Sequence, residues 1–392
     1  MEQAALYRTI WRWHFYAGLF VIPFIIILSV TGSIYLFKPQ IDRWQEREWR
    51  GLSIESSVSA EDQVAAAMAV VPGGQLHNFR LPEHAGDAAM VHIGLPDGSG
   101  MRDVYVSPKG EVMAKIDPEN RISATIARIH SSLLVGKTGG YLVELAASWA
   151  IVMILTGLYL WWPRSGTTGK SRLAGILWPR LKSGGRMFWK DLHAVTGFWI
   201  SGLVLVTLAS GLPWTDGWAT AFRYVRGEMG WVTQAPQDWK GGVDLHAAHD
   251  HSAMMAGEAP AMPDGGMGLN DIVAMAEKEN MPFPAIILPP GAPARFGPPN
   301  GADWKLTSEA QNRPLIRTVT YDAQTGEETG RNGFADRHVI DRVINYGIAW
   351  HEGQLLGLFN QIVGVVTALA LILLSVSSVK MWWQRRPQNA GL

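Results

Sequence analysis

Four histidines combine a metal-binding side chain with closely matched surroundings. His130 and His351 are each followed by a glycine after six residues, two tryptophans after 31 and 32, and an arginine after 34. His14 and His193 are each followed by a glycine after four residues and by a Thr-Gly or Ser-Gly pair after 17 and 18. Imidazole is a common metal ligand and an axial ligand of many haem groups. The two patterns predict a duplicated unit with two candidate ligand histidines in each copy.

Pairing across the copies joins His14 with His193 and His130 with His351. A helical bundle can hold a haem between two such imidazoles. The alternative is that each histidine is an ordinary polar residue at a membrane interface. A single histidine favours that interpretation, whereas four at matched registers argue against it, because ionisable groups in membrane helices are costly and usually functional. The nearby glycines permit close approach of a bulky group, although glycine is also common where membrane helices pack.

A second cluster of metal-binding side chains consists of His246, His249 and His251, followed by Met254 and Met255. Imidazole and thioether groups suit copper or another soft transition metal. The surrounding Ala, Gly, Pro and Met residues are also typical of a mobile loop. No residue is assigned as a catalytic group. The histidines without partner spacing, interpreted as surface or domain residues, are His77, His84, His92 and His338.

The composition excludes several other chemistries. The 392 residues carry a formal net charge of zero, which gives no argument for nucleic acid as a partner. The chain has no cysteine, which rules out iron–sulfur clusters, covalently attached haem, thiol catalysis and disulfides. No glycine-rich dinucleotide fingerprint follows a predicted strand. An electron donor is therefore expected to be a quinol, a reduced carrier or a partner protein.

Four apolar runs are long enough to cross a lipid membrane. The first, 15–37, has no charge over 23 residues and continues directly into Lys38, which favours an uncleaved anchor over a signal peptide. The other three lie at 141–162, 194–214 and 355–379. Basic residues gather between the second and third runs and after the fourth. The positive-inside rule then places both termini in the cytoplasm of a bacterial inner-membrane protein, with two long connections in the periplasm.

Each long connection has the pattern of a small α+β module. Ser59 and Asp62 form a capping box at the start of one helical pattern, and Asn270 is placed to cap the other. Strand-like runs follow, and Tyr105 and Tyr321 each precede a turn with glycine and glutamate at the same offsets. The predicted order is helix 1 over 9–37, module 1 over 38–125, helix 2 over 126–163, a cytoplasmic basic loop over 164–187, helix 3 over 188–214, module 2 with the His/Met-rich insertion over 215–345, and helix 4 over 346–384.

These features together resemble the PepSY-associated transmembrane family, and within it the FoxB-type inner-membrane siderophore reductases. The resemblance rests on the His-x-x-x-Gly span, the external module, the second histidine-bearing span and the Trp-Trp-basic ending, all of which are repeated along nearly the whole chain. It implies a mainly α membrane protein with four transmembrane helices, two periplasmic PepSY-like modules and two haem b groups. The haem ligation of the family carries over to His14, His193, His130 and His351.

The resemblance also implies an oxidoreductase of iron uptake. Electrons from a quinol or another cytoplasmic-side donor would reduce a periplasmic ferric siderophore, and Fe(II), which hard oxygen donors bind less well, would be released. One alternative keeps the haem-dependent reductase but makes copper the substrate, with the His/Met cluster as its receptor. Another is a non-redox protein whose modules regulate a peptidase or bind a cell-wall ligand. A transporter of the intact chelate is disfavoured, because the repeat is parallel and lacks broken helices.

Overall fold

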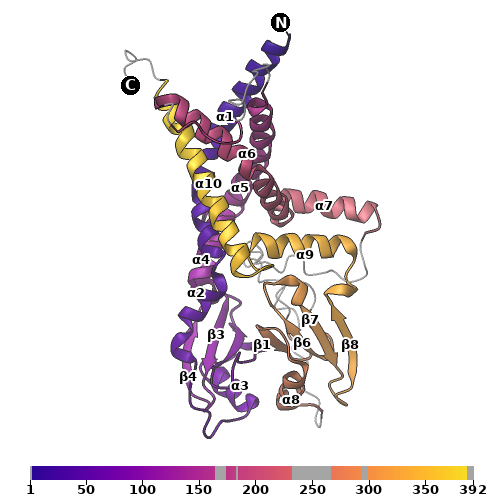
Figure 1. Ribbon diagram of the computed structural model, residues 1–392. Helices are drawn as coiled ribbons and strands as arrows, with labels where there is room; N and C mark the ends of the chain where they lie inside the picture. The colour runs from indigo at the N-terminus through magenta and orange to yellow at the C-terminus, as the bar shows by residue number, and fades with distance from the viewer. Residues whose placement is uncertain (1, 164–173, 182–183, 232–265, 294–298, 386–392) are drawn as a thin grey trace. The chain divides into compact units, whose positions relative to one another are not determined.

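The computed structural model describes residues 2–163, 174–181, 184–231, 266–293 and 299–385, which divide into two compact units (Figure 1). The helical unit consists of Met1–Phe37, Ile126–Val225 and Trp350–Leu392. The sheet unit consists of Lys38–Thr125 and Arg226–Ala349. Each unit takes segments from both halves of the chain, as a duplication of one helix–module–helix element requires.

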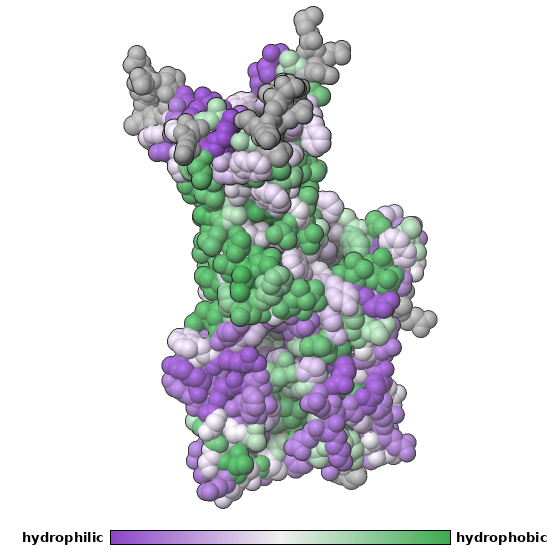
Figure 2. All heavy atoms as spheres, in the orientation of Figure 1, coloured by the Kyte–Doolittle hydropathy of each residue, from purple (hydrophilic) through white to green (hydrophobic). Residues whose placement is uncertain are grey.

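Four helices among the described residues are long and apolar enough to cross a membrane, which confirms the four predicted spans. α1 packs against α5 and α10, and α6 packs against α10 and α5. The helical unit carries an extended hydrophobic surface (Figure 2), on which Leu19, Val206 and Leu369 are more than half exposed. A band of this kind is stable in hydrocarbon and not in water. The spans are Ala4–Tyr35 within α1 (Glu2–Tyr35), α5 (Gly136–Trp161), Gly185–Trp214 comprising α6 (Gly185–Gly211) and η4 (Leu212–Trp214), and α10 (Leu358–Trp383).

The helices predicted over 126–163 and 346–384 are each two helices in the structure. His130 lies in α4 (Ile122–Ser132) and His351 ends α9 (Val339–His351). Each histidine therefore lies in a short helix before a membrane span and not in the span itself. Gly136 and Gly357, six residues after each histidine, have φ angles of +62° and +58°. Glycine accepts this backbone conformation without a Cβ clash. The shared glycine is therefore the sequence signal of the break, and the apolar run alone does not reveal it.

The sheet unit contains one antiparallel sheet of eight strands in the order β4-β3-β2-β1-β5-β6-β7-β8. Each half of the chain contributes four strands and one helix that packs on them, α3 or α8, and β1 pairs with β5 where the halves meet. The two predicted α+β modules thus share a single sheet. The elements are α3 (Ala60–Ala69), β1 (Gln75–Arg80), β2 (Ala89–Gly94), β3 (Met101–Val106), β4 (Val112–Ile116), α8 (Leu269–Glu279), β5 (Ala285–Leu288), β6 (Trp304–Ser308), β7 (Arg317–Tyr321) and β8 (Glu328–Gly333).

Local signals explain how these elements begin and turn. The capping box of Ser59 and Asp62 starts α3 as predicted, and Gly110 and Gly326, with φ of +82° and +72°, form the β3–β4 and β7–β8 turns. The core between sheet and helices includes Val91, Ile93, Ile272, Ile287 and Leu306. The shorter elements are α2 (Lys38–Gln45), η1 (Arg47–Trp49), η2 (Pro118–Asn120), α7 (Asp216–Glu228), η7 (Arg313–Leu315) and η8 (Phe334–Asp336).

The prediction that Asn270 caps its own helix is wrong. The N-cap of α8 is Gly268, and the side-chain oxygen of Asn270 accepts from the backbone N–H of Glu61 at 3.2 Å. Glu61 reciprocates, because its carboxylate accepts from the backbone N–H of Asn270 at 3.4 Å. The N-termini of α3 and α8 thus cap one another, which joins the two halves of the sheet unit on the helix side as the β1–β5 pairing does in the sheet.

Candidate functional site

The four histidines of the repeat lie in two pairs inside the helical unit. The rings of His14 on α1 and His193 on α6 have centroids 6.4 Å apart and planes at 86°. The rings of His130 on α4 and His351 on α9 have centroids 6.3 Å apart and planes at 76°. The two pairs are almost identical in separation, and each takes one imidazole from each half of the chain.

The first pair is held by backbone carbonyls and hydroxyls of the neighbouring helices. Nδ1 of His14 lies 3.1 Å from the carbonyl oxygen of Met153 and 3.1 Å from Oγ1 of Thr156, both on α5. The Thr156 hydroxyl donates to the Val152 carbonyl at 2.7 Å, so it accepts from the histidine. Nδ1 of His193 has the equivalent partners on α10, the carbonyl of Leu374 at 3.2 Å and the hydroxyls of Ser377 and Ser378 at 3.1 and 3.2 Å.

The second pair is held in the same manner. Nδ1 of His351 lies 2.9 Å from the carbonyl oxygen of Thr207 and 3.3 Å from Oγ of Ser210, both on α6. Nδ1 of His130 lies 3.0 Å from Oγ1 of Thr31 on α1, whose hydroxyl donates to the Ile27 carbonyl at 2.8 Å. All four Nδ1 atoms therefore face acceptors, which fixes the tautomer with the proton on Nδ1 and leaves the Nε2 lone pair for a metal.

Three glycines make room for these rings. A Cβ atom at Gly32 would lie 3.1 Å from Cε1 of His130, and one at Gly211 would lie 2.9 Å from Cε1 of His351. A Cβ at Gly157 would lie 3.1 Å from Cε1 of His14. Each of these glycines follows a hydroxyl residue that contacts the same imidazole. We call the Thr-Gly or Ser-Gly pair a cradle, because the hydroxyl group of the first residue contacts the imidazole and the glycine leaves space for the ring.

The glycines four residues after His14 and His193 serve helix packing. A Cβ at Gly18 would meet the Met153 side chain at 3.5 Å, and one at Gly197 would meet the Leu374 side chain at 3.7 Å. Met153 and Leu374 are also the residues whose carbonyls face His14 and His193. The His-x-x-x-Gly pattern therefore brings α1 close to α5 and α6 close to α10, so that the carbonyl reaches the imidazole.

The ring separations fit one metal ion between the imidazoles of each pair. A metal–imidazole bond of about 2 Å, added to about 1.2 Å from ring nitrogen to centroid, puts two rings on opposite sides of one ion about 6.4 Å apart. The observed values are 6.4 and 6.3 Å. The two imidazoles of a pair could thus bind one ion, as histidines bind the iron of a haem. The residues present therefore fit a haem at each pair.

Two glutamates near the spans have different environments. The carboxylate of Glu144 accepts from the backbone N–H groups of Gly217 and Trp218 at 3.0 and 2.9 Å, at the start of α7. This is helix capping, strengthened by the helix dipole, and not a contact with an imidazole. Glu352 follows His351 and is buried with 4% of its surface exposed, so a carboxyl group lies inside the helical unit beside a candidate ligand.

Several predicted residues lie outside the described part of the chain. They include His246, His249 and His251 of the insertion, and residues 164–173 and 182–183, which are half of the basic loop. Arg180 of that loop is described, and its guanidinium forms an ion pair with the buried carboxylate of Asp191 on α6 at 2.6 Å. This arginine therefore anchors the loop to a span, and its charge is already compensated.

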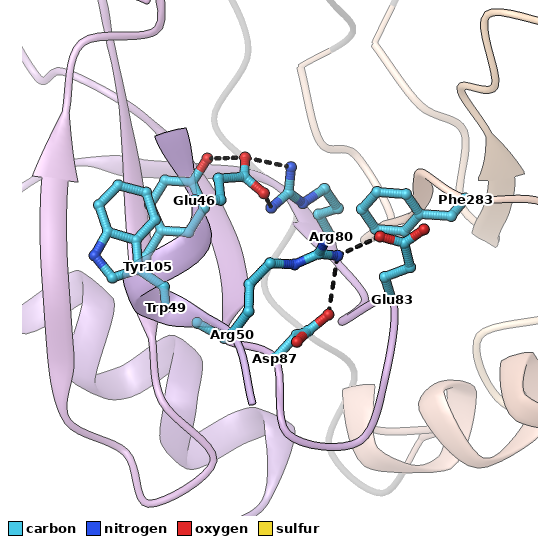
Figure 3. A pocket seen from close by; sticks show the side chains of 9 residues that line it. Glu46, Trp49, Arg50, Arg80, Glu83, Asp87, Tyr105 and Phe283 are labelled. Atoms are coloured by element: carbon cyan, nitrogen blue, oxygen red, sulfur yellow. Dashed lines mark hydrogen bonds and ion pairs between the residues drawn. The ribbon is translucent and has the colours of Figure 1, made fainter. Parts of the chain in front are cut away.

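A buried charge network lies in the sheet unit (Figure 3). The carboxylate of Glu46 accepts from Arg121 at 2.7 Å, from Tyr105 at 2.8 Å, and from Arg80 at 3.1 Å. Burial alone would raise the pKa of Glu46, but the charges of Arg80 and Arg121 outweigh it and lower the pKa to about 2. The network ties the segment before η1 to the sheet.

The small hollow beside this network offers no free ligand set. Arg50 bridges Glu83 and Asp87, at 3.0 Å from the latter. These two carboxylates and His84 form the one group of three or more His or acidic residues in metal-binding geometry among the described residues. Since Arg50 pairs with both carboxylates and Arg43 also pairs with Glu83, the group serves as an ion-pair cluster of the fold and not as a metal centre.

Comparison with known protein families gives one result that spans the chain. A family model described as "PepSY-associated TM region" matches residues 11–385. The matched region includes most of the first span, the other three spans, both histidine pairs and the sheet unit. No curated protein matches the chain.

Proposed function

This chain belongs to the PepSY-associated transmembrane family, and on that premise we propose that it is a di-haem oxidoreductase. In this proposal it passes electrons across the bacterial inner membrane to a ferric siderophore. The observation that carries the proposal is the pairing of four imidazoles across the repeats, with 6.4 and 6.3 Å between the ring centroids of the two pairs, so that two histidines could hold one iron at each site. A haem b bound at each pair would supply one-electron redox chemistry at its iron.

The residues of the chain would set the environment of both groups. Carbonyl and hydroxyl acceptors on Nδ1 hold each ring in position and make Nε2 more basic, which strengthens its bond to iron. The glycines at the cradles keep the rings close to their helices. The absence of cysteine requires that the haems be bound without covalent attachment.

The positions of the pairs support transfer across the membrane. His14 and Thr31, the residue that holds His130, are separated by 17 residues of α1. At 1.5 Å per residue this is about 26 Å, close to the thickness of the hydrocarbon core of about 30 Å. The positive-inside rule assigns the His14–His193 pair to the cytoplasmic side and the His130–His351 pair to the periplasmic side. An electron moving outward would gain about 2.3 kcal/mol per 100 mV of membrane potential.

The oxygen atoms that bind iron in a siderophore explain how reduction releases the metal. A siderophore binds Fe(III) through hard oxygen atoms, and one electron converts it to Fe(II), which those atoms bind less well. The products are Fe(II) and the free siderophore. The electron comes from a quinol or a reduced cytoplasmic-side carrier.

The test begins with the purified protein in detergent. A pyridine haemochrome assay is expected to give close to two haems per chain, with no covalent haem after acid–acetone extraction. His84, an exposed histidine of the sheet unit with 75% of its side chain accessible, provides a control, and His84→Ala should retain both haems. A colourless protein after expression with added haem precursor would refute the proposal.

A second measurement tests the two sides. His351→Ala is expected to lose the His130–His351 site alone, so that a cytoplasmic-side donor still reduces one haem but ferric siderophore reduction stops. His193→Ala is expected to leave a haem that dithionite reduces but the cytoplasmic-side donor does not. Full turnover in both variants, or loss of both haems from either folded variant, would show that the pairs do not act as two sites in series.

A further inference from the structure

Two histidines of the sheet unit, which do not belong to the repeat pattern, also lie close together. The rings of His77 on β1 and His92 on β2 have centroids 5.8 Å apart and are perpendicular. His77 is buried, with 5% of its surface exposed. Both lie outside the four candidate spans, and neither belongs to the histidine pairs of the helical unit.

A β-bulge brings His77 to this position. Leu76 pairs with Ile93 and Asn78 pairs with His92, so His77 is the extra residue between them. Regular alternation would place His77 on the core face together with Phe79. Instead its Nε2 lies 2.7 Å from the position that a Cβ of Gly94 would occupy, on the face that His92 shares. Bulges commonly redirect a side chain in this way next to functional sites.

The other groups around the two rings are suited to a metal ion. Nδ1 of His92 lies 2.6 Å from Oδ1 of Asp103, which is buried. This carboxylate–histidine pair leaves Nε2 of His92 for an ion and matches the outer-shell arrangement of many metal sites. Oδ1 of Asn78, directly across from His92, is buried and has no hydrogen-bond partner within the described residues. A buried oxygen acceptor without a donor is costly unless a cation or water fills the position.

Gly94 and Met101 complete the surroundings. The Cβ position of Gly94 lies 2.7 Å from Nε2 of His77 and 3.6 Å from Sδ of Met101. The two ligand atoms therefore approach the same space, which is open because residue 94 has no side chain. Imidazole, amide oxygen and thioether together favour a first-row transition ion of borderline softness over Ca²⁺ or Mg²⁺.

The ring separation distinguishes this cluster from the two pairs in the helical unit. With bonds of about 2 Å, two imidazoles on one ion have centroids about 5.2 Å apart at the tetrahedral angle and about 6.4 Å apart when they are opposite. The observed 5.8 Å falls between these limits, so the two rings meet an ion at a bent angle. We propose that His77 and His92 bind one divalent transition metal ion of the Cu²⁺ or Zn²⁺ class, with Asn78 as a further oxygen ligand.

The protonation state of His77 is consistent with this role. Burial and the neighbouring His92 lower the pKa of His77 to about 4. The imidazole is therefore neutral near pH 7 and does not have to lose a proton before it binds a metal. Asp103 next to His92 supplies a negative charge that partly balances the ion.

The experiment uses the full-length protein in detergent, with His246, His249 and His251 replaced by glutamine so that the insertion contributes no imidazole. After treatment with a chelator, the protein is dialysed against Cu²⁺, and bound copper is counted and examined by electron paramagnetic resonance. One Cu²⁺ per chain is expected, with hyperfine structure from two nitrogen ligands. Absence of a stoichiometric ion at micromolar Cu²⁺, or a signal without nitrogen coupling, would overturn the proposal.

Variants locate the site. His77→Gln and His92→Gln should each lower Cu²⁺ affinity at least 100-fold, and Asp103→Asn should lower it about 10- to 100-fold, the usual effect of removing such a partner. His84→Gln, an exposed histidine in the same unit, should bind copper as the parent does. If both histidine variants fail to fold, Asp103→Asn decides the matter, and an unchanged Cu²⁺ affinity in that variant refutes the site. Haem content is measured in every sample, so loss of the helical-unit sites is recognised separately.

Discussion

Gly211 offers a test of the imidazole cradles that leaves every proposed ligand unchanged. A Cβ at this position would lie 2.9 Å from Cε1 of His351 and 3.4 Å from its Nδ1. The backbone of Gly211 is helical, with φ of −84°, so alanine is not strained there. The added methyl group must therefore displace the ring from its contacts with Thr207 and Ser210, since the helix backbone cannot move without disturbing its packing.

The expected size of the effect follows from overpacking. Forcing one extra carbon into a closely packed site costs about 1–3 kcal/mol. If the whole cost fell on the haem-bound state, haem affinity would drop by about 5- to 150-fold, at 1.4 kcal/mol for each factor of ten. Gly202→Ala is the matched control on the same helix, because a Cβ there would meet nothing within 4 Å. Alanine at that position should leave haem binding unchanged and slightly favour the helix.

The assay is titration of haem-depleted protein with haem, followed by optical and electron paramagnetic resonance spectra. Gly211→Ala should bind one haem as the parent protein does and the second more weakly or with an altered low-spin signal. Gly202→Ala should bind both normally. If Gly211→Ala bound both haems with unchanged affinity and spectra, the space beside His351 would have no bearing on ligation, and the cradle interpretation would be wrong.

Two further predictions concern the sheet unit and the insertion. The pKa of Glu46 is lowered to about 2 from the ordinary value of 4.5, so its ion pairs contribute up to about 3 kcal/mol to stability above pH 4.5. This contribution is lost as the pH falls towards 2. Glu46→Gln should therefore lower the melting temperature at pH 7, with a difference that shrinks in acid, whereas Glu48→Gln, with 75% of its side chain exposed, should change it little. Replacement of His246, His249 and His251 by alanine is expected to leave both haems and siderophore reduction intact; loss of that reduction would instead assign the insertion to substrate binding.

The spacing of the repeat was sufficient to predict the two pairs, because duplication places equivalent side chains at equivalent positions. The partners of Nδ1 were not predictable in the same way. Met153 and Leu374 act through backbone carbonyls, which any residue carries, and the contact depends on how closely two helices approach. The repeat does not reveal Thr156-Gly157, because the equivalent pair in the second half is Ser377-Ser378 and lacks the glycine.

His77 illustrates a different limit of sequence analysis. Period-two alternation assigns a strand residue to one face, and a single extra residue reverses that assignment for the side chain at the bulge. The position of the bulge depends on the pairing of β1 with β2, which the sequence of β1 alone does not contain. The failure for Asn270 has a similar origin, because its capping partner Glu61 is 209 residues away.

The hydrogen bonds that orient the histidines and the contacts that pair them have different origins. His14 is held by α5 and His130 by α1, both from the first repeat, while His193 is held by α10 and His351 by α6, both from the second. Each repeat thus orients its own two imidazoles, and only the meeting of the repeats supplies a second ring to each site. Removing one histidine should therefore leave its partner correctly placed and its own acceptors in position.

Chemical rescue tests this consequence. In His351→Gly, the carbonyl of Thr207 and the hydroxyl of Ser210 remain on α6, and the space of the lost ring is available. Added imidazole can donate its N–H to those acceptors and offer its other nitrogen to the site, so millimolar imidazole should restore the low-spin spectrum of the missing haem. In the double variant His351→Gly with Gly211→Leu, the larger side chain occupies that space, and rescue should fail at the same concentration. Equal rescue in both variants would mean that the imidazole binds elsewhere, and that the acceptors on α6 do not orient the ligand.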